Sequence, residues 1–406
     1  MIILLINKNG KKIEFDESFE QDKIDYYIKE QGFEIVEDKT KKKQGIEIID
    51  NPRSVKRIAV FEENCHFYSG GRYFGFSVLK ALEELASSLN FKVDYYTNLE
   101  PAFVHDYDLY QNTELKIIKS FGDQMDIKAD LYLSYPKFGN IQAIKMAERY
   151  NKKALCFIFD PLPYVEKCVP GEYKSEKEYV APMVKEIRNS DCKIVVISEL
   201  TRDHSDKWLK RNRKDIDIVY PVVNSRVMNT VPNCKKENFV TYISRLVDRK
   251  HYDECFRAFS KMNSKWRLQI ITSRQFTKEL EETAAKYDIR DRIDAYYSAT
   301  DYQKFELLKK SKFLFNSSRF EGFGMWAAEA IATGNRVVCY NYPTIREIIK
   351  VSGAKEYFNF AKYGDYEDFE KKVIETSQQA SVLEPNTKFG FDFLVEQVRE
   401  LLIKNL

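Results

Sequence analysis

The stretch NSSRFEGFGMWAAEAIATGNRVVCYN, residues 316–341, contains one complete strand–helix–strand step of the fold. The apolar segment KFLFNSS (312–318) predicts a strand that ends near Ser318, and two glycines predict a tight loop over 319–324. The alanine-rich segment predicts a helix from about Met325 to Thr333, ended by Gly334 as its C′ residue. RVVCYN (336–341) is the next strand. Two strands joined by such a helix predict a parallel sheet.

The same alternation of short apolar strands and helical stretches extends along the chain. It begins with the strand RIAVFEE (57–63) and continues to the strand DIVYPVV (217–223). After a linker marked by Pro221 and the polar residues 229–238, it restarts with the strands NFVTYIS (238–244), WRLQIIT (266–272) and RIDAYY (292–297). We therefore predict an α/β protein with two doubly wound domains, at 54–225 and 226–385. Ligands of such sheets bind outside the carboxyl ends of the strands, which predicts a site in a cleft between the two domains.

Residues 1–53 look separate and predict a small α+β appendage. The strands IILLIN and KKIEF flank Asn9-Gly10, a strong hairpin signal. A helix near 21–30 and the strands FEIVE (33–37) and IEIID (46–50) are expected to follow. The lysine run 41–43 predicts a solvated loop, and the sequence does not indicate what this segment does.

The loop at 319–324 and the following helix combine the groups that a phosphorylated, hydroxyl-rich ligand needs. Gly322 and Gly324 let the backbone pass close to a ligand, and the N–H groups at the start of a helix favour an anion. Glu321 lies in the loop, and Glu329 lies early in the helix, where its side chain leans back toward the same ligand. The alternative is a helix cap beside a solvated glutamate.

A second segment, TYISRLVDRKHYDECFRAF (241–259), places two cations after the first strand of the second domain. Arg245 and Lys250 at the carboxyl end of this strand could clamp a pyrophosphate. The alternative is ordinary surface charge, because about one residue in three of the whole chain is charged.

Together the two segments resemble a known family. Ser244-Arg245-Leu246 with Lys250, followed by E-G-F-G from Glu321 with Glu329 eight positions on, is similar to the pattern of retaining GT-B glycosyltransferases of the GT4 type. The segment KFGFDFLVEQVRELL (388–402) resembles the family's terminal helix, which crosses back onto the first domain, so 386–406 is expected to pack there. The resemblance covers residues 56–406 and implies two Rossmann-like domains.

The resemblance also implies roles for individual residues. Arg245 and Lys250 would neutralise the diphosphate of a nucleotide-sugar donor, and Glu329 would accept from its ribose hydroxyls. Glu321 would be the catalytic carboxylate beside the donor sugar. Backbone N–H groups of Gly322, Phe323, Gly324 and Met325 would hold sugar hydroxyls or phosphate. The glycine turn SGG (69–71) would let Gly70 and Gly71 approach the phosphates.

The implied activity is transfer of a sugar from a nucleotide-diphosphate sugar to an acceptor hydroxyl, with retention and without a metal or other cofactor. UDP- and GDP-sugars are the favoured donors, and base contacts are expected near 296–298. The acceptor stays open among glycan, lipid-linked, protein and nucleic-acid hydroxyls. Two alternatives are a non-catalytic glycan- or nucleotide-binding module and a nucleotide-sugar epimerase on the same fold.

One position departs from the family pattern. Family members often have a histidine at the end of the strand that reads CFIFDP here, where Phe159 and Asp160 stand. Asp160 could take over a contact to the donor sugar, or it could cap the turn before Pro161. His105 is a second candidate near the cleft, although a surface histidine is the simpler interpretation.

Composition and spacing argue against several other classes of protein. A net charge of +3 argues against a dedicated nucleic-acid binder, and we find no run of apolar residues long enough to span a membrane. Seven scattered cysteines without a C-x-x-C pair predict a reduced, cytoplasmic protein, with peripheral membrane contact left open through basic runs such as 207–214. Asp215 and Asp217 read D-x-D but open a strand, so they point oppositely and predict no metal site.

Overall fold

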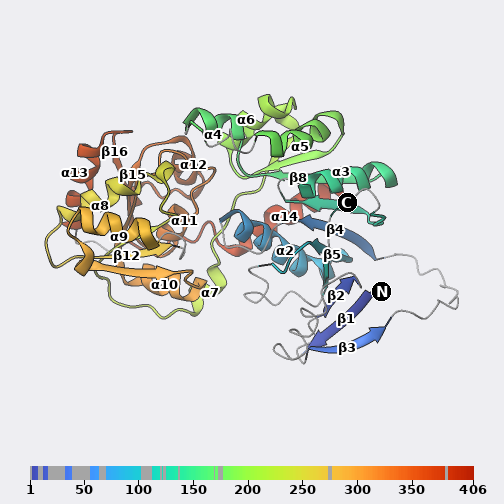
Figure 1. Ribbon diagram of the computed structural model, residues 1–406, viewed down its shortest axis with the longest axis horizontal. Helices are drawn as coiled ribbons and strands as arrows, with labels where there is room; N and C mark the ends of the chain where they lie inside the picture. The colour runs from blue at the N-terminus through green and yellow to red at the C-terminus, as the bar shows by residue number, and fades with distance from the viewer. Residues whose placement is uncertain are drawn as a thin grey trace, which may run out of the picture.

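The computed structural model describes residues 2–7, 12–16, 33–38, 55–63, 70–101, 112–118, 121, 125–135, 138–168, 170–171, 177–272, 277–379 and 383–406, with backbone only for the first three ranges. The chain forms two lobes, each built around a twisted sheet with helices on both faces (Figure 1). This confirms the predicted α/β class with two doubly wound domains.

The C-terminal domain has a six-stranded sheet in the order β13-β12-β11-β14-β15-β16, and every neighbouring pair is parallel. This is the doubly wound order, in which the chain reverses direction across the sheet between β11 and β14. The strands are β11 (Glu237–Ile243), β12 (Arg267–Thr272), β13 (Ile293–Tyr297), β14 (Ser311–Asn316), β15 (Arg336–Tyr340) and β16 (Phe358–Ala361). The sequence predicted the first five and missed the short β16.

Helices cover both faces of this sheet. One face carries α8 (Tyr252–Ser260), α9 (Thr277–Lys286) and α13 (Tyr366–Ser377); α8 contacts both of the other helices, and α8 and α13 pack on β14. The other face carries α10 (Asp301–Lys310), α11 (Met325–Ala332) and α12 (Pro343–Ser352). The loop between β14 and α11 therefore opens at the carboxyl edge of the sheet, beside the residues that follow β11.

The N-terminal domain repeats this order at the centre of a larger sheet. Its parallel strands run in the order β10-β9-β8-β7-β4-β5-β6. They are β4 (Lys56–Glu62), β5 (Phe91–Thr97), β6 (Thr113–Ile117), β7 (Leu131–Ser134), β8 (Lys153–Ile158), β9 (Lys193–Val196) and β10 (Ile216–Ile218). The sequence did not predict β6, and it predicted a longer strand at β10.

The helices of this domain separate onto two faces. α2 (Gly70–Leu89) and α14 (Phe391–Asn405) pack against each other, so the last helix of the chain lies on the first domain (Figure 1). The Lys56 ammonium donates to the terminal Leu406 carbonyl at 2.8 Å. α3 (Phe138–Tyr150) and α5 (Lys177–Asn189) cover the opposite face. α4 (Leu162–Cys168) and α6 (Glu199–Leu209) follow β8 and β9 at the edge nearest the C-terminal domain (Figure 1).

The strands of the N-terminal appendage continue the first domain's sheet. β1 (Ile2–Asn7) pairs antiparallel with β2 (Lys12–Asp16) and β3 (Phe33–Asp38), and β2 pairs parallel with β6. The β1–β2 pairing confirms the predicted hairpin, although its turn at 8–11 lies outside the described residues. The helix predicted at 21–30, the strand at 46–50 and the lysine run at 41–43 also lie outside them.

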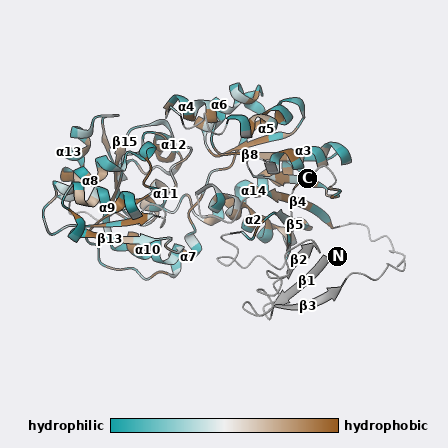
Figure 2. Cartoon of the chain, viewed as in Figure 1, coloured by the Kyte–Doolittle hydropathy of each residue, from teal (hydrophilic) through white to brown (hydrophobic). Residues whose placement is uncertain are grey.

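Hydrophobic residues concentrate on the strands of both sheets, while the helices contain both hydrophilic and hydrophobic residues (Figure 2). An aromatic cluster joins the two domains at the crossing of the chain. The Phe323 ring lies 5.3 Å from that of Phe389 and 6.1 Å from that of Tyr220, and Phe389 packs on Phe393 of α14 at 5.9 Å. This cluster holds the β14–α11 loop against the domain junction.

Candidate functional site at the carboxyl edge of the C-terminal sheet

The β14–α11 loop has the backbone that its sequence predicts. Gly324 is the N-cap of α11 with a φ of 100°, a left-handed conformation that favours glycine. A Cβ atom at Gly324 would also lie 3.3 Å from Ile345 Cδ1. In the described part of the chain no side chain caps α11. The N–H groups at the start of this helix are therefore available to an anionic or hydroxylated ligand.

Glu321 of this loop meets Lys250, which follows β11. The Lys250 Nζ atom lies 2.6 Å from Glu321 Oε1 and 2.7 Å from Oε2. The Trp326 indole donates to the same Oε1 at 3.1 Å. Lys250 is only 6% exposed. The structure thus joins two of the residues selected from separate segments of the sequence, at the point where the strand order reverses.

The surroundings of this pair favour the ionised carboxylate. Burial alone would raise the pKa of Glu321, but the charge and hydrogen bonds of Lys250, and then the charge of Arg249, lower it below its usual value. Burial is the largest effect on Lys250 and lowers its pKa, while Glu321 opposes that shift. Glu321 therefore stays an anion at neutral pH.

Two further cations lie close to the pair. Arg249 and Arg245 are near enough for their charges to lower the pKa of Lys250, after the larger effect of its burial. Arg245 is exposed, and Arg249 is partly buried. The sequence analysis selected Arg245 and missed Arg249, although its place beside Lys250 could have suggested it. Lys250 and its two neighbouring arginines form a group of cations beside Glu321 that could receive a diphosphate.

Glu329 lies on α11 in a different ion-pair network. Its Oε1 atom is 2.6 Å from Lys304 Nζ of α10, which also lies 2.7 Å from Asp301 Oδ1. Asn224 at the domain junction donates to Asp301 at 2.9 Å, and Tyr73 of α2 also hydrogen-bonds Asp301. Burial raises the pKa of Glu329, and Lys304 only partly offsets this effect. The sequence selected Glu329 but gave no reason to select Lys304 or Asp301.

The first domain supplies a surface that touches the loop. A Cβ atom at Gly322 would lie 2.8 Å from Asp160 Oδ1 and 3.0 Å from the Phe159 carbonyl oxygen. Gly322 is therefore required for this close approach. Asp160 lies beside the β14–α11 loop and is therefore still a candidate contact for a ligand bound there.

The predicted glycine turn at 69–71 is wrong from Gly70 onward. Gly70 and Gly71 form the first turn of α2 instead of a turn. A Cβ atom at Gly71 would lie 3.0 Å from the ring of Phe159, whereas at Gly70 it would meet no atom within 4 Å. The start of α2 thus lies next to the strand end that carries Asp160. Ser69 and His105 lie outside the described residues.

The side chains of Phe323 and Met325 pack into the hydrophobic core. Phe323 is 3% exposed and belongs to the aromatic cluster at the junction. Met325 is half-buried and packs against the same hydrophobic core. Any donor contact of these two residues would therefore be made by backbone N–H groups.

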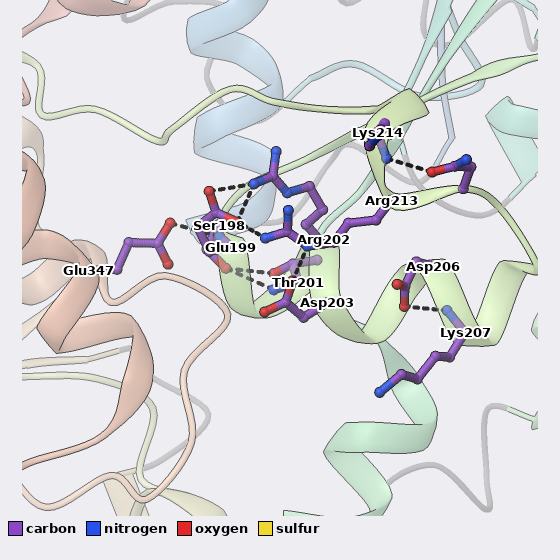
Figure 3. Close-up of polar contacts among 11 residues, drawn as sticks. Ser198, Glu199, Thr201, Arg202, Asp203, Asp206, Lys207, Arg213, Lys214 and Glu347 are labelled. Carbon is purple, nitrogen blue, oxygen red and sulfur yellow. Dashed lines mark hydrogen bonds and ion pairs between the residues drawn. The ribbon is translucent and has the colours of Figure 1, made fainter.

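The start of α6 makes a second contact across the domains, which the sequence analysis did not predict. Ser198 Oγ donates to the Gly322 carbonyl at 2.7 Å, and the Glu199 N–H donates to Glu347 Oε1 of α12 at 2.7 Å. Figure 3 shows Glu347 reaching this end of α6, beside Ser198, Thr201 and Arg202. The sequence gave no signal for these contacts, because they join elements more than a hundred residues apart.

We find no metal cluster in the described ranges: no three His, Cys, Asp or Glu residues lie together there. Asp217, the second aspartate of the D-x-D sequence, pairs with Lys404 of α14 at 2.6 Å. Across the same ranges, no helix combines the length and the apolar character that a membrane crossing requires.

Comparison with known proteins identifies the domain that carries the site. The model of the family "Glycosyl transferases group 1" matches residues 227–387, which include Arg245, Lys250, Glu321 and Glu329. No curated protein matches the chain. The matched range contains both segments that the sequence analysis selected.

Solved structures with the same two-domain fold are similar in shape and distant in sequence. HepE of Anabaena, in complex with UDP and glucose, is 12% identical with a TM-score of 0.67, over 86% of this chain and 100% of that chain. Sucrose-phosphate synthase of Thermosynechococcus elongatus is 14% identical with a TM-score of 0.64, over 86% and 98%. WaaG, a glycosyltransferase involved in lipopolysaccharide biosynthesis, is 13% identical with a TM-score of 0.59, over 84% and 94%. The GT-B fold and a glycosyl-transfer enzyme, as predicted, are confirmed.

Proposed function

We propose that this glycosyl-transfer enzyme moves a sugar from a nucleotide-diphosphate sugar to an acceptor hydroxyl, with retention of anomeric configuration and without a metal ion. One observation carries the proposal. Lys250 and Glu321, from two segments 71 positions apart, meet at the switch point of the C-terminal sheet beside Arg245 and Arg249. A donor of this class carries a diphosphate for the cations and sugar hydroxyls for the carboxylate.

Cleavage of the donor builds negative charge on the leaving diphosphate, and the three cations would stabilise it. One ion pair at 4 Å contributes about 4 kcal/mol at an effective dielectric constant of 20. One preorganised hydrogen-bond donor, such as an N–H at the start of α11, contributes roughly 3–4 kcal/mol. These groups supply the charge that a divalent cation would otherwise provide, which supports a metal-independent reaction.

Donor binding would rearrange the Lys250–Glu321 pair. The diphosphate competes for the Lys250 ammonium, and the sugar hydroxyls can then donate to the Glu321 oxygens that Lys250 releases. Glu329, which now accepts from Lys304, is proposed to accept from the ribose hydroxyls. Glu321 would thus change partner from a cation to the donor sugar, where its charge also supports positive character on the ring.

UDP- and GDP-sugars are the proposed donors, with UDP-sugars first. A solved structure of the similar HepE contains UDP-glucose, which motivates this order of tests. Retention fits an acceptor that attacks on the face of the leaving diphosphate, from the side of the first domain where Asp160 stands. We propose Asp160 as a donor-sugar contact, the residues near 296–298 as base contacts, and a hydroxyl of unidentified class as the acceptor.

The test is incubation of the protein with UDP- and GDP-sugars and a panel of hydroxyl acceptors, in buffer with EDTA. Nucleotide release is measured together with proton NMR of the product. We expect release that depends on the acceptor and an anomeric coupling unchanged from the donor. An inverted anomer would refute retention, and loss of activity in EDTA that Mg²⁺ restores would refute metal independence. An epimerised sugar without transfer would support the epimerase alternative, and binding without turnover would support the non-catalytic one.

A further inference from the structure

Ser198 connects the first domain to the β14–α11 loop through its hydroxyl group. It is the N-cap of α6 and is fully buried, with extended backbone angles of −166° and 164°. Its Oγ atom accepts from the Thr201 N–H at 3.1 Å, the usual bond of a helix cap. The same oxygen donates to the Gly322 carbonyl of the C-terminal domain at 2.7 Å. A residue that only capped the helix would not need this second bond.

The hydrogen-bonding capacity of the two hydroxyls fixes the direction of each proton. A serine hydroxyl has one proton, and here the Gly322 carbonyl, which can only accept, takes it. The Thr201 hydroxyl lies 2.8 Å from Ser198 Oγ and 3.5 Å from the Gly322 oxygen, so its proton goes to the Ser198 oxygen. Both hydroxyls are fully buried. The hydrogen bonds from Thr201 to Ser198 and from Ser198 to Gly322 therefore cross the domain boundary, and both hydroxyl protons have an acceptor.

The Gly322 carbonyl orients the part of the loop that would touch the donor. Because a peptide group is planar and trans, fixing the Gly322 carbonyl toward α6 turns the Phe323 N–H in the opposite direction. Gly322 also follows Glu321 directly, and the Glu321 carbonyl accepts from Thr344 of α12 at 3.3 Å. Ser198 and Thr344 thus hold the two consecutive carbonyls of this loop from different domains.

Glu347 adds a second contact at the same junction. Its carboxylate, on α12 of the C-terminal domain, accepts the Glu199 N–H at 2.7 Å at the start of α6 (Figure 3). A negative charge is favoured at a helix N-terminus. Two consecutive residues of the first domain, Ser198 and Glu199, therefore each donate a hydrogen bond across the boundary to the C-terminal domain. These bonds form only while the domains are closed on each other.

We propose that Ser198 is a positioning residue that couples closure of the first domain onto the C-terminal domain to the geometry of the β14–α11 loop at Glu321 and Gly322. This inference rests on the proposed function for its kinetic consequence. When α6 withdraws, the Gly322 peptide loses its anchor, and Glu321 and the Phe323 N–H lose the orientation that transfer requires. Donor binding to the cations does not depend on this anchor, because Arg245 and Lys250 follow β11 on the C-terminal domain.

Three substitutions at one position separate this role from simple capping. Ser198→Ala removes both the cap and the cross-domain bond. Ser198→Gly removes the cross-domain bond but keeps most of the cap stability, because glycine is a tolerated N-cap. Ser198→Thr keeps both bonds. Ser205→Ala is the matched control, since Ser205 is a buried serine of the same helix whose Oγ has no partner among the described residues.

We expect Ser198→Ala and Ser198→Gly to lower kcat alike, by about tenfold as for a lost hydrogen bond, with donor KM nearly unchanged. Ser198→Ala should lower the melting temperature more than Ser198→Gly, because both lose the buried bond but only alanine also loses most of the cap stability. Ser198→Thr should recover turnover, and Ser205→Ala should match the wild type. The proposal is overturned if Ser198→Gly turns over like wild type, or if kcat falls only in proportion to the melting temperature.

Amide hydrogen exchange gives a readout that does not require turnover. Exchange in the loop 320–324 should be faster in Ser198→Gly than in wild type and in Ser205→Ala, at the same fraction folded. Unchanged exchange in this loop would refute the positioning role even if the enzyme were inactive. Faster exchange in a protein that turns over no nucleotide sugar would instead refute the proposed function and leave the coupling intact.

Discussion

Replacing Glu321 by glutamine is the sharpest test of the site, because it should lower turnover while nucleotide affinity holds or rises. Gln has nearly the same shape and keeps one oxygen that can accept from Lys250. It removes the charge that Lys250 faces at 2.6 and 2.7 Å. The substitution therefore removes the proposed catalytic carboxylate and, at the same time, frees the ammonium that the diphosphate is proposed to use.

The expected magnitudes follow from the burial of this pair. Removing one partner of a buried ion pair typically costs about 3–5 kcal/mol of unfolding free energy. The glutamine oxygen keeps part of the bond, so we expect a loss of about 2–3 kcal/mol. Turnover should fall by about 100- to 1,000-fold, as when one preorganised charge-stabilising group is lost. Nucleotide affinity should hold or rise by up to about tenfold, about 1.4 kcal/mol, because Lys250 no longer has to leave a carboxylate.

Three measurements on the same preparation decide the outcome. Calorimetric titration with UDP and GDP gives the affinity, nucleotide release gives the turnover, and thermal unfolding with and without nucleotide gives the stability. The nucleotide should raise the melting temperature of Glu321→Gln at least as much as that of wild type. Glu367→Gln is the control, since Glu367 is an exposed glutamate in the first turn of α13.

The reasoning would be refuted if Glu321→Gln kept wild-type turnover. It would also be refuted if nucleotide affinity fell in parallel with turnover, because Glu321 would then bind nucleotide instead of competing for Lys250.

Three further predictions test other parts of the site. Lys250→Met should weaken nucleotide binding by about 10- to 100-fold by calorimetry, with a further loss when Arg245→Ala is added, while exposed Lys265→Met should bind as wild type. Unchanged affinity would remove both cations from the site. Gly322→Ala places a Cβ atom 2.8 Å from Asp160 Oδ1, so we expect small-angle scattering to show a wider particle and turnover to fall; a compact, active variant would contradict the packing. Burial raises the pKa of Glu321, but Lys250, Arg249 and the Trp326 indole together lower it below its usual value of 4.5. The pair therefore stabilises the fold above that value and loses this contribution as the pH falls through the lowered pKa. The stability difference between wild type and Glu321→Gln should therefore be level above about pH 5 and shrink in more acidic solution, and a difference that grew there would contradict the sign.

Periodicity and turn residues were sufficient to predict most of the strands and helices in their order. The loop glycines, the helix from Met325 and the strand-end positions of Arg245 and Lys250 are local features, and parallel strands bring such ends to one edge. The short strands β6 and β16 were missed because four or five residues give little alternation to detect. The two glycines that begin α2 suggested a turn, but the helical sequence after them determines their conformation.

Contacts between distant segments were beyond the reach of sequence patterns. Lys304 pairs with Glu329 because α10 and α11 lie on one face of the sheet, which no spacing encodes. Ser198 looks like an ordinary helix cap, and its bond to Gly322 exists only through the packing of one domain on the other. The sequence therefore predicts which charged residues lie at the carboxyl edge of the C-terminal sheet, whereas the packing of the folded chain determines which of them form ion pairs.

A crystal structure with a bound nucleotide sugar tests the central claim most directly. The account predicts the diphosphate within hydrogen-bonding distance of Lys250 Nζ and Arg245, the sugar hydroxyls on Glu321, and the Lys250–Glu321 bonds of 2.6 and 2.7 Å broken or lengthened. A saturated complex that keeps these two bonds and holds its diphosphate elsewhere would contradict it.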